Sequence, residues 1–235
     1  MRPTPRIDPR ARGVAQWLLT VGFDRYLTTH VSGVHHVPPE GVPTLVTANH
    51  SSSLDVFAGG YAVGRPGFFL AKAEIVRLPL AGRFLRACGA IPAQRTGRDI
   101  AALKEMVAVL SAGHLLGVAP EGTRSPTGEL LPYDPGFVWL ARRTGAVVVP
   151  CAIHGTWQLM PKGRRLPRRG PVWIAFGEPV DVAAEQFGGD DRAAADQVRT
   201  RTLELLLELA RQSGLAGPQV AVTREAATSQ SATTS

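Results

Sequence analysis

The chain has 235 residues, of which 44% are hydrophobic and 6% aromatic, and it carries a formal net charge of +7 at pH 7. This length suits one α/β core, and neither an internal repeat nor a long central linker divides the sequence into two domains. The charge gathers in two segments, 1–12 and 162–169, and the second holds five basic residues, no acidic residue and no aromatic one. Nucleic acid is therefore the weakest partner for this charge. An anionic lipid surface or an acidic carrier protein suits it better, and a solvated loop is the simplest alternative.

Apolar side chains recur at helical spacing near the N-terminus, at Val14, Trp17, Leu18 and Val21. Arginines precede this segment, but no small-residue cleavage site follows it, so we do not interpret it as a signal peptide. A basic flank and one apolar face suit a helix that lies in a membrane interface. The same face could instead pack on the protein's own core, and both interpretations stay open. No segment reaches the ~18 apolar residues that a membrane-spanning helix needs.

Short apolar runs bounded by Gly or Pro predict buried strands along the rest of the chain. They span 43–48, 67–71, 89–93, 114–119, 146–153 and 171–177. Helical spacing predicts helices over 97–112 and 190–212, the second opened by an aspartate and closed by Gly214. Strands that alternate with helices predict a single α/β domain with a mostly central β-sheet flanked by helices.

The two cysteines, Cys88 and Cys151, lie far apart in the sequence and in apolar surroundings. This placement is typical of free, buried thiols in a reducing compartment rather than of a disulfide framework. A nucleophilic Cys151 is disfavoured, because the thiol lies within an apolar run that predicts a strand.

His50 and Asp55 follow the first apolar run and stand five positions apart. Histidine is the side chain best suited to accept a proton near neutral pH, and a carboxylate on its second ring nitrogen would fix its tautomer. One reaction that such a pair could catalyse is acyl transfer from a thioester to a hydroxyl. The thioester is already activated, so the enzyme needs no nucleophile of its own and only has to remove the hydroxyl proton. The alternative is structural, because Ser52-x-x-Asp55 also matches a helix-capping pattern in which Asp55 only satisfies backbone N–H groups.

A second polar motif, Glu121-Gly122-Thr123-Arg124-Ser125, follows the fourth apolar run. Gly122 allows close backbone approach, Thr123 and Ser125 offer hydroxyls, and the planar fork of Arg124 matches a phosphate. Glu121 would repel a phosphate, so we expect it to bond Arg124, to bond a substrate hydroxyl or to hold the loop in place. An ordinary polar turn with a surface Glu–Arg pair is the alternative.

With both motifs in place, the chain resembles the lysophosphatidic acid acyltransferase family (1-acyl-sn-glycerol-3-phosphate acyltransferases, PlsC-like). The family's H-x4-D block resembles residues 49–55, and its E-G-T-R block resembles residues 120–125. Two weaker blocks follow in the family's order, at 89–95 and 148–153, and the similarity covers about residues 33–181. Pro92 and Gln94 depart from the family's pattern in the first of these weaker blocks, so the resemblance fixes the reaction type better than the acceptor.

The resemblance implies a general base, His50, that Asp55 orients. It also implies a substrate-binding set around the acceptor phosphate, comprising Lys72, Arg95, Glu121, Gly122, Thr123 and Arg124. The donor would be acyl-CoA or acyl carrier protein and the acceptor a lysophospholipid, most fittingly 1-acyl-sn-glycerol-3-phosphate, which yields phosphatidic acid. No metal and no tightly bound cofactor are expected.

The expected organisation is a membrane-associating helix in residues 1–32, an acyltransferase domain in 33–214 and a disordered tail in 215–235. An anionic membrane surface would be the partner of the two basic segments, which implies a peripheral protein on the cytoplasmic face of the cell membrane. Acylation of another lysolipid or of glycerol phosphate is an alternative, as is a non-catalytic lipid-binding relative. A hydrolase with Ser51 as nucleophile is disfavoured, because no G-x-S-x-G elbow is present and Ser51 is adjacent to His50.

Overall fold

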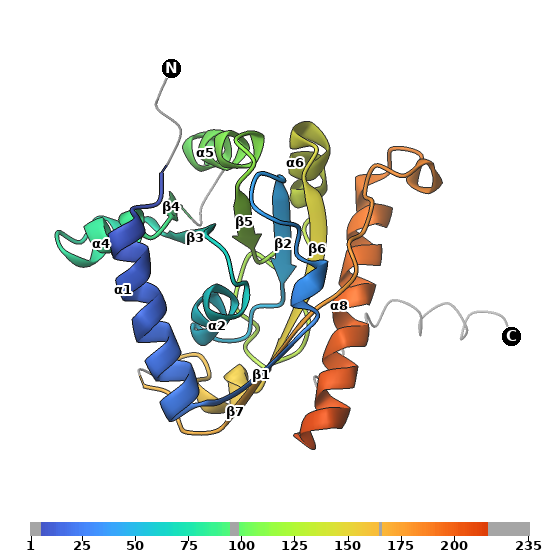
Figure 1. Ribbon diagram of the computed structural model, residues 1–235. Coiled ribbons are helices and arrows are strands. Elements are labelled where there is room, and N and C mark those ends of the chain that lie inside the picture. The colour runs from blue at the N-terminus through green and yellow to red at the C-terminus, as the bar shows by residue number, and fades with distance from the viewer. Residues whose placement is uncertain (1–5, 95–98, 165, 216–235) are drawn as a thin grey trace, which may run out of the picture.

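The computed structural model describes residues 6–94, 99–164 and 166–215. Its centre is a seven-stranded sheet with the strand order β1-β7-β6-β2-β5-β3-β4 (Figure 1). The strands are β1 Thr28–Ser32, β2 Thr44–Ala48, β3 Gly67–Lys72, β4 Ala90–Ala93, β5 Leu115–Val118, β6 Val147–His154 and β7 Pro171–Phe176. Neighbours are parallel except β6 and β7. The carboxyl ends of β2 to β6 therefore share one edge of the sheet with the amino ends of β1 and β7.

Helices cover both faces of this sheet. They are α1 Pro9–Thr20, α2 Leu54–Ala62, α3 Ala73–Val76, α4 Ala81–Ala87, α5 Ile100–Ser111, α6 Gly136–Thr144, α7 Thr156–Leu159 and α8 Asp191–Ser213. Short 3-10 helices span Val34–His36 and Glu185–Phe187, and a π-helical turn, Val21–Tyr26, follows α1. Because successive strand residues point to opposite faces, Leu45 packs in the core beneath α5, α6 and α8, and Val46 packs in the core beneath α2. Figure 1 shows α1 and α2 on one side of the sheet and α8 on the other.

The predicted α/β class and the central sheet are confirmed, and each of the six predicted strands is present within one residue at each end. The seventh strand, β1, was not predicted. It is an edge strand whose residues are mostly exposed and include two threonines, a histidine and a serine, so it lacks the apolar run that marks a buried strand. It lies within 1–32, so the sheet begins inside the segment expected to precede the domain.

The N-terminal helix α1 forms where its spacing predicted. The Asp8 carboxylate accepts hydrogen bonds from the N–H groups of Arg10 and Ala11, and Pro9 begins the helix. Its apolar side chains do not pack on the core, since Val14 is 53%, Trp17 64% and Leu18 51% exposed. The core-packing interpretation of this face is therefore wrong. Within the described ranges, no helix is both long and apolar enough to cross a membrane.

The end of the N-terminal segment meets the basic loop between α7 and β7. The Tyr26 hydroxyl donates a hydrogen bond to the carbonyl oxygen of Pro167 at 3.0 Å, and the Arg169 guanidinium lies 5.2 Å from the Tyr26 ring centroid. Tyr61 of α2 stacks on Phe23 of the π-helical turn, with 5.1 Å between ring centroids. These contacts place the basic loop beside Tyr26, at the end of the N-terminal segment, and that segment packs on α2 through Phe23.

Candidate active site

The two polar motifs lie side by side at the carboxyl edge of the sheet. His50 follows β2 and Glu121 follows β5, and these strands are neighbours with Thr47 paired to Val118. The strand order therefore brings together residues that stand 71 positions apart in the sequence. Lys72, at the end of β3, lies on the same edge two strands from β2, and its side chain is exposed. Arg95 lies outside the described residues.

The His50 imidazole and the Asp55 carboxylate form a hydrogen-bonded pair. His50 Nδ1 lies 3.0 Å from Asp55 Oδ2. The histidine side chain is 19% exposed and the aspartate side chain 3%. A carboxylate accepts the Nδ1 proton, which leaves Nε2 as the ring nitrogen free to accept a proton from a substrate. The pair thus has the geometry of a general base and its orienting acid.

Asp55 also organises the turn that leads into α2. Its Oδ2 accepts hydrogen bonds from the backbone N–H groups of Ser51 at 2.8 Å and Ser52 at 2.7 Å. The Ser52 hydroxyl accepts from the N–H of Leu54 at 3.1 Å and donates to the carbonyl of Met160. The structural and the catalytic interpretations of Asp55 therefore do not exclude each other, because one carboxylate oxygen serves the turn and the imidazole together.

The 121–125 loop holds His50 from both sides of its peptide backbone. Glu121 Oε1 accepts from the N–H of His50 at 2.7 Å, and the N–H of Ser125 donates to the His50 carbonyl at 2.7 Å. Arg124 Nη1 donates to the Ser53 hydroxyl at 2.6 Å. The two motifs are consequently one hydrogen-bonded unit rather than two loops that happen to be near each other.

Glu121 holds the loop in place, which is one of the three roles expected for it. Its Oε2 accepts from the backbone N–H of Leu131 at 3.2 Å, so both carboxylate oxygens are committed to backbone groups rather than to Arg124. Burial raises the pKa of Glu121 to about 7, although the hydrogen bonds from His50 and Leu131 oppose that shift. An ordinary surface pair with Arg124 is not what this carboxylate forms.

The remaining motif residues form the open tip of this loop. Gly122 and Thr123 are exposed, and Arg124 is half-buried. Gly122 has φ 65°, a left-handed conformation that favours glycine, and a Cβ there would meet no atom within 4 Å. The tip can therefore be approached by a ligand, while the other end of the loop is fixed to His50.

Two residues near the pair were not identified from the sequence as parts of the site. The Asn49 amide bonds both the N–H and the carbonyl of Ile153, which ties the end of β2 to β6. Thr156, the first residue of α7, donates a hydrogen bond from its hydroxyl to Asp55 Oδ1 at 2.6 Å. No local pattern reveals such a contact, because Thr156 stands 101 positions from Asp55 and meets it only through the adjacency of β2 and β6.

Cys151 does not belong to the reacting groups. It is 1% exposed in the core beneath α2, and burial, assisted by the negative charge of Asp55, raises the pKa of its thiol. A thiol held protonated in an apolar core is a poor nucleophile. Cys88 is also free, and its thiol donates to the carbonyl of Ala11.

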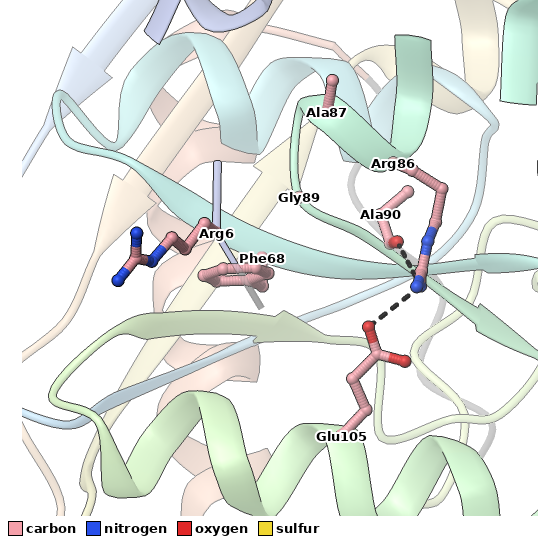
Figure 2. A pocket seen from close by; sticks show the side chains of 7 residues that line it. All are labelled: Arg6, Phe68, Arg86, Ala87, Gly89, Ala90 and Glu105. Atoms are coloured by element: carbon pink, nitrogen blue, oxygen red, sulfur yellow. Dashed lines mark hydrogen bonds and ion pairs between the residues drawn. The ribbon is translucent and has the colours of Figure 1, made fainter. Parts of the chain in front are cut away.

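A separate cavity of about 300 Å³ opens at the opposite edge of the sheet, at the amino ends of β3 and β4 (Figure 2). Phe68 and Arg6 lie on one side of it. On the other side Arg86 Nη1 bonds Glu105 at 2.9 Å and the carbonyl of Ala90 at 3.4 Å. This cavity contains none of the residues of the two motifs.

Comparison with known proteins matches this geometry to a family. The sequence model described as Acyltransferase matches residues 28–154, which is more than half of the chain. A chloroplastic 1-acyl-sn-glycerol-3-phosphate acyltransferase of Brassica napus is 26% identical over 194 residues, covering 81% of this chain and 54% of the relative. The 1-acyl-sn-glycerol-3-phosphate acyltransferase alpha of Homo sapiens is 31% identical over 198 residues, covering 82% of this chain and 68% of the relative. The chain spans about half the length of the Brassica and Arabidopsis relatives it matches.

A solved structure shares the fold. The crystal structure of the 1-acyl-sn-glycerophosphate acyltransferase PlsC from Thermotoga maritima superposes with a TM-score of 0.72 at 28% sequence identity, covering 89% of this chain and 83% of that one. The family match begins at the first residue of β1 and ends at the last residue of β6, so it contains both motifs and the strands that carry them. The chain therefore belongs to the acyltransferase family.

Proposed function

We propose that this protein transfers a fatty acyl chain from acyl-CoA or acyl carrier protein to the free hydroxyl of a lysophospholipid. The acceptor that fits best is 1-acyl-sn-glycerol-3-phosphate, with phosphatidic acid as the product. The names of the relatives support this acceptor. One observation carries the proposal: the loop that bears Arg124 holds the backbone of His50, whose imidazole is bonded to Asp55.

In the proposed reaction, Nε2 of His50 removes the proton from the acceptor hydroxyl while its oxygen attacks the thioester carbonyl carbon. The C–O bond forms, the C–S bond breaks, and the proton passes from His50 to the departing sulfur. Asp55 keeps Nδ1 protonated and balances the charge that the imidazole gains in between. General base catalysis of this kind contributes about 10²- to 10⁴-fold to a rate. No step calls for a metal or a bound cofactor.

The acceptor phosphate would bind at the open tip of the 121–125 loop. Arg124 uses one N–H on Ser53 and keeps other guanidinium donors for the phosphate oxygens. Thr123 and the Gly122 backbone are exposed beside it, and Lys72 extends the positive edge towards β3. We assign Arg95 to the same phosphate through the family resemblance alone. Glu121 serves this set by holding the loop.

The membrane proposal rests on the exposed face of α1 and on the basic loop. Leu166 is 75% exposed in this loop, between Arg164 and Arg168. Each Lys or Arg near an anionic surface contributes about 1 kcal/mol, and an exposed apolar helix face adds to that attraction. We propose that the protein binds peripherally to the cell membrane, at its cytoplasmic face. Flotation with phosphatidylserine-containing liposomes tests this, and unchanged binding after Trp17→Glu with charge reversal of Arg168 and Arg169 would contradict it.

Transfer of a labelled acyl chain from acyl-CoA to lysophosphatidate tests the proposed reaction. The native protein should form labelled phosphatidic acid, and His50→Ala should lose nearly all of that activity. A parallel series with glycerol 3-phosphate and neutral lysolipids identifies the acceptor, and release of free fatty acid without an acceptor detects a hydrolase. Full activity in His50→Ala would remove the general base from the mechanism.

A further inference from the structure

The two oxygens of the Asp55 carboxylate have different partners. Oδ2 accepts from His50 Nδ1 and from the N–H groups of Ser51 and Ser52. Oδ1 accepts from the Thr156 hydroxyl at 2.6 Å. Asp55 is 4% exposed and Thr156 is fully buried, so this short bond joins two groups shielded from water. It sets the rotation of the carboxylate about its Cβ–Cγ bond from the side opposite the imidazole.

The backbone around Thr156 is fixed by its surroundings. Gly155 has φ 92°, and a Cβ at this position would lie 2.4 Å from the carbonyl oxygen of Pro171. Only glycine can make this turn so close to β7. Just upstream of Gly155, the backbone of Ile153 is hydrogen-bonded to the amide side chain of Asn49, which is the residue before His50. Thr156 is therefore held at a set position relative to the base, and it does not reach Asp55 through a flexible loop.

A second hydroxyl lies behind this bond. Ser51 Oγ is 3.5 Å from Thr156 Oγ1, and both side chains are buried. Because the Thr156 proton points to a carboxylate, the threonine oxygen presents lone pairs to Ser51. The order of donation runs from Ser51 to Thr156 to Asp55, and the carboxylate in turn receives the proton of His50 Nδ1.

We infer that Thr156 is a positioning residue for the base: it holds the Asp55 carboxylate so that Oδ2 faces His50 Nδ1. The inference rests on the proposed function of His50. Without the hydroxyl, Oδ1 becomes a buried acceptor with a missing donor, and only the bonds on Oδ2 then hold the carboxylate against turning. A turned carboxylate no longer selects the tautomer in which Nε2 is free. Thr156 itself stays out of contact with the substrate.

Three variants separate this role from simple packing. Thr156→Val keeps the shape and removes the hydroxyl, and Thr156→Ser keeps the hydroxyl. Thr44→Val makes the same change at another fully buried threonine, at the amino end of β2, where the hydroxyl donates to the carbonyl of Val42 and to no other group among the described residues. We expect Thr156→Val to lower kcat by about tenfold with the KM values for both substrates within about twofold. Thr156→Ser should recover most of that loss, and Thr44→Val should match the native kcat.

A second readout is independent of activity. In ¹⁵N-histidine spectra recorded at a pH where imidazoles are neutral, the His50 signal, assigned by its loss in His50→Ala, should report the Nδ1–H tautomer in the native protein. Thr156→Val should shift it to a mixture of tautomers, with the folded state verified by thermal unfolding, and Thr156→Ser should restore it. An unchanged tautomer in Thr156→Val overturns the inference, as does a kcat within about twofold of native. If the tautomer shifts but no lipid is acylated by the native protein, the proposed function fails and the positioning role stands.

Discussion

The turn after β2 and the loop after β5 are both short polar segments that follow buried strands, yet they are built differently. In the first, Ser51, Ser52 and Asp55 are buried and Asp55 alone accepts four hydrogen bonds. In the second, Gly122 and Thr123 are exposed at the tip, while Glu121 and Ser125 bond to His50. Under the proposed function the two segments have different roles: the buried turn would fix the reacting imidazole, and the open tip would bind the substrate.

The rigid turn should respond to a loss of charge with the largest effect. Asp55→Asn keeps an oxygen for the N–H groups of Ser51 and Ser52, so the turn should fold. The amide cannot balance the charge on a protonated His50, and kcat should fall on the order of 10⁴-fold, as for the corresponding change in serine proteases. Steady-state transfer to lysophosphatidate measures this, with circular dichroism as the control for folding. A kcat close to native would mean that Asp55 is only a cap.

The open tip should respond in binding instead. Arg124→Ala removes the guanidinium and its bond to Ser53, and charge-assisted hydrogen bonds are worth about 1.5–3 kcal/mol. The acceptor KM should therefore rise by about 10- to 100-fold, with a much smaller change in kcat. The donor KM serves as the internal control, because the contact that Arg124→Ala removes is to the phosphate of the acceptor. An unchanged acceptor KM would remove Arg124 from the phosphate site and undo the division between the two segments.

Glu121 connects the two segments and should make their stability depend on pH. Its pKa rises from 4.5 to about 7 on folding, so the folded protein binds a proton that the unfolded chain releases. The free energy of unfolding should therefore fall as pH rises from 4.5 to 7, by up to about 2–3 kcal/mol for this residue. Glu121→Gln should remove that slope. Urea unfolding of both proteins at pH 5, 6 and 7.5 provides the measurement, and parallel pH profiles would show that the carboxylate is not protonated in the folded state.

Much of this fold follows from local pattern, because buried parallel strands carry apolar runs that stand out in the sequence. His50, Asp55 and Arg124 also follow such runs, but their roles rest on the family resemblance and stay predictions. What could not be predicted depends on strand order. Thr156 meets Asp55 only because β6 lies beside β2, and the clamp of Glu121 on His50 requires β5 on the other side of β2. The edge strand β1 escaped prediction because an exposed strand needs no apolar run.

The smallest effect should come from the exposed hydroxyl at the tip. Thr123 is not buried, so Thr123→Ala should change the free energy of unfolding by less than about 0.5 kcal/mol. Water competes for this exposed hydroxyl, so its hydrogen bond to the phosphate should contribute only about 0.5–1.5 kcal/mol, and the acceptor KM should rise by about two- to tenfold with kcat preserved. The two variants are expected to change different constants. Asp55→Asn should lower kcat, whereas Thr123→Ala should raise only the acceptor KM, because the tip binds substrate without stabilising the fold. A fall in kcat at unchanged KM would mean that the exposed tip also takes part in fixing the base, a role that the structure gives only to Glu121 and Ser125 at the ends of this loop.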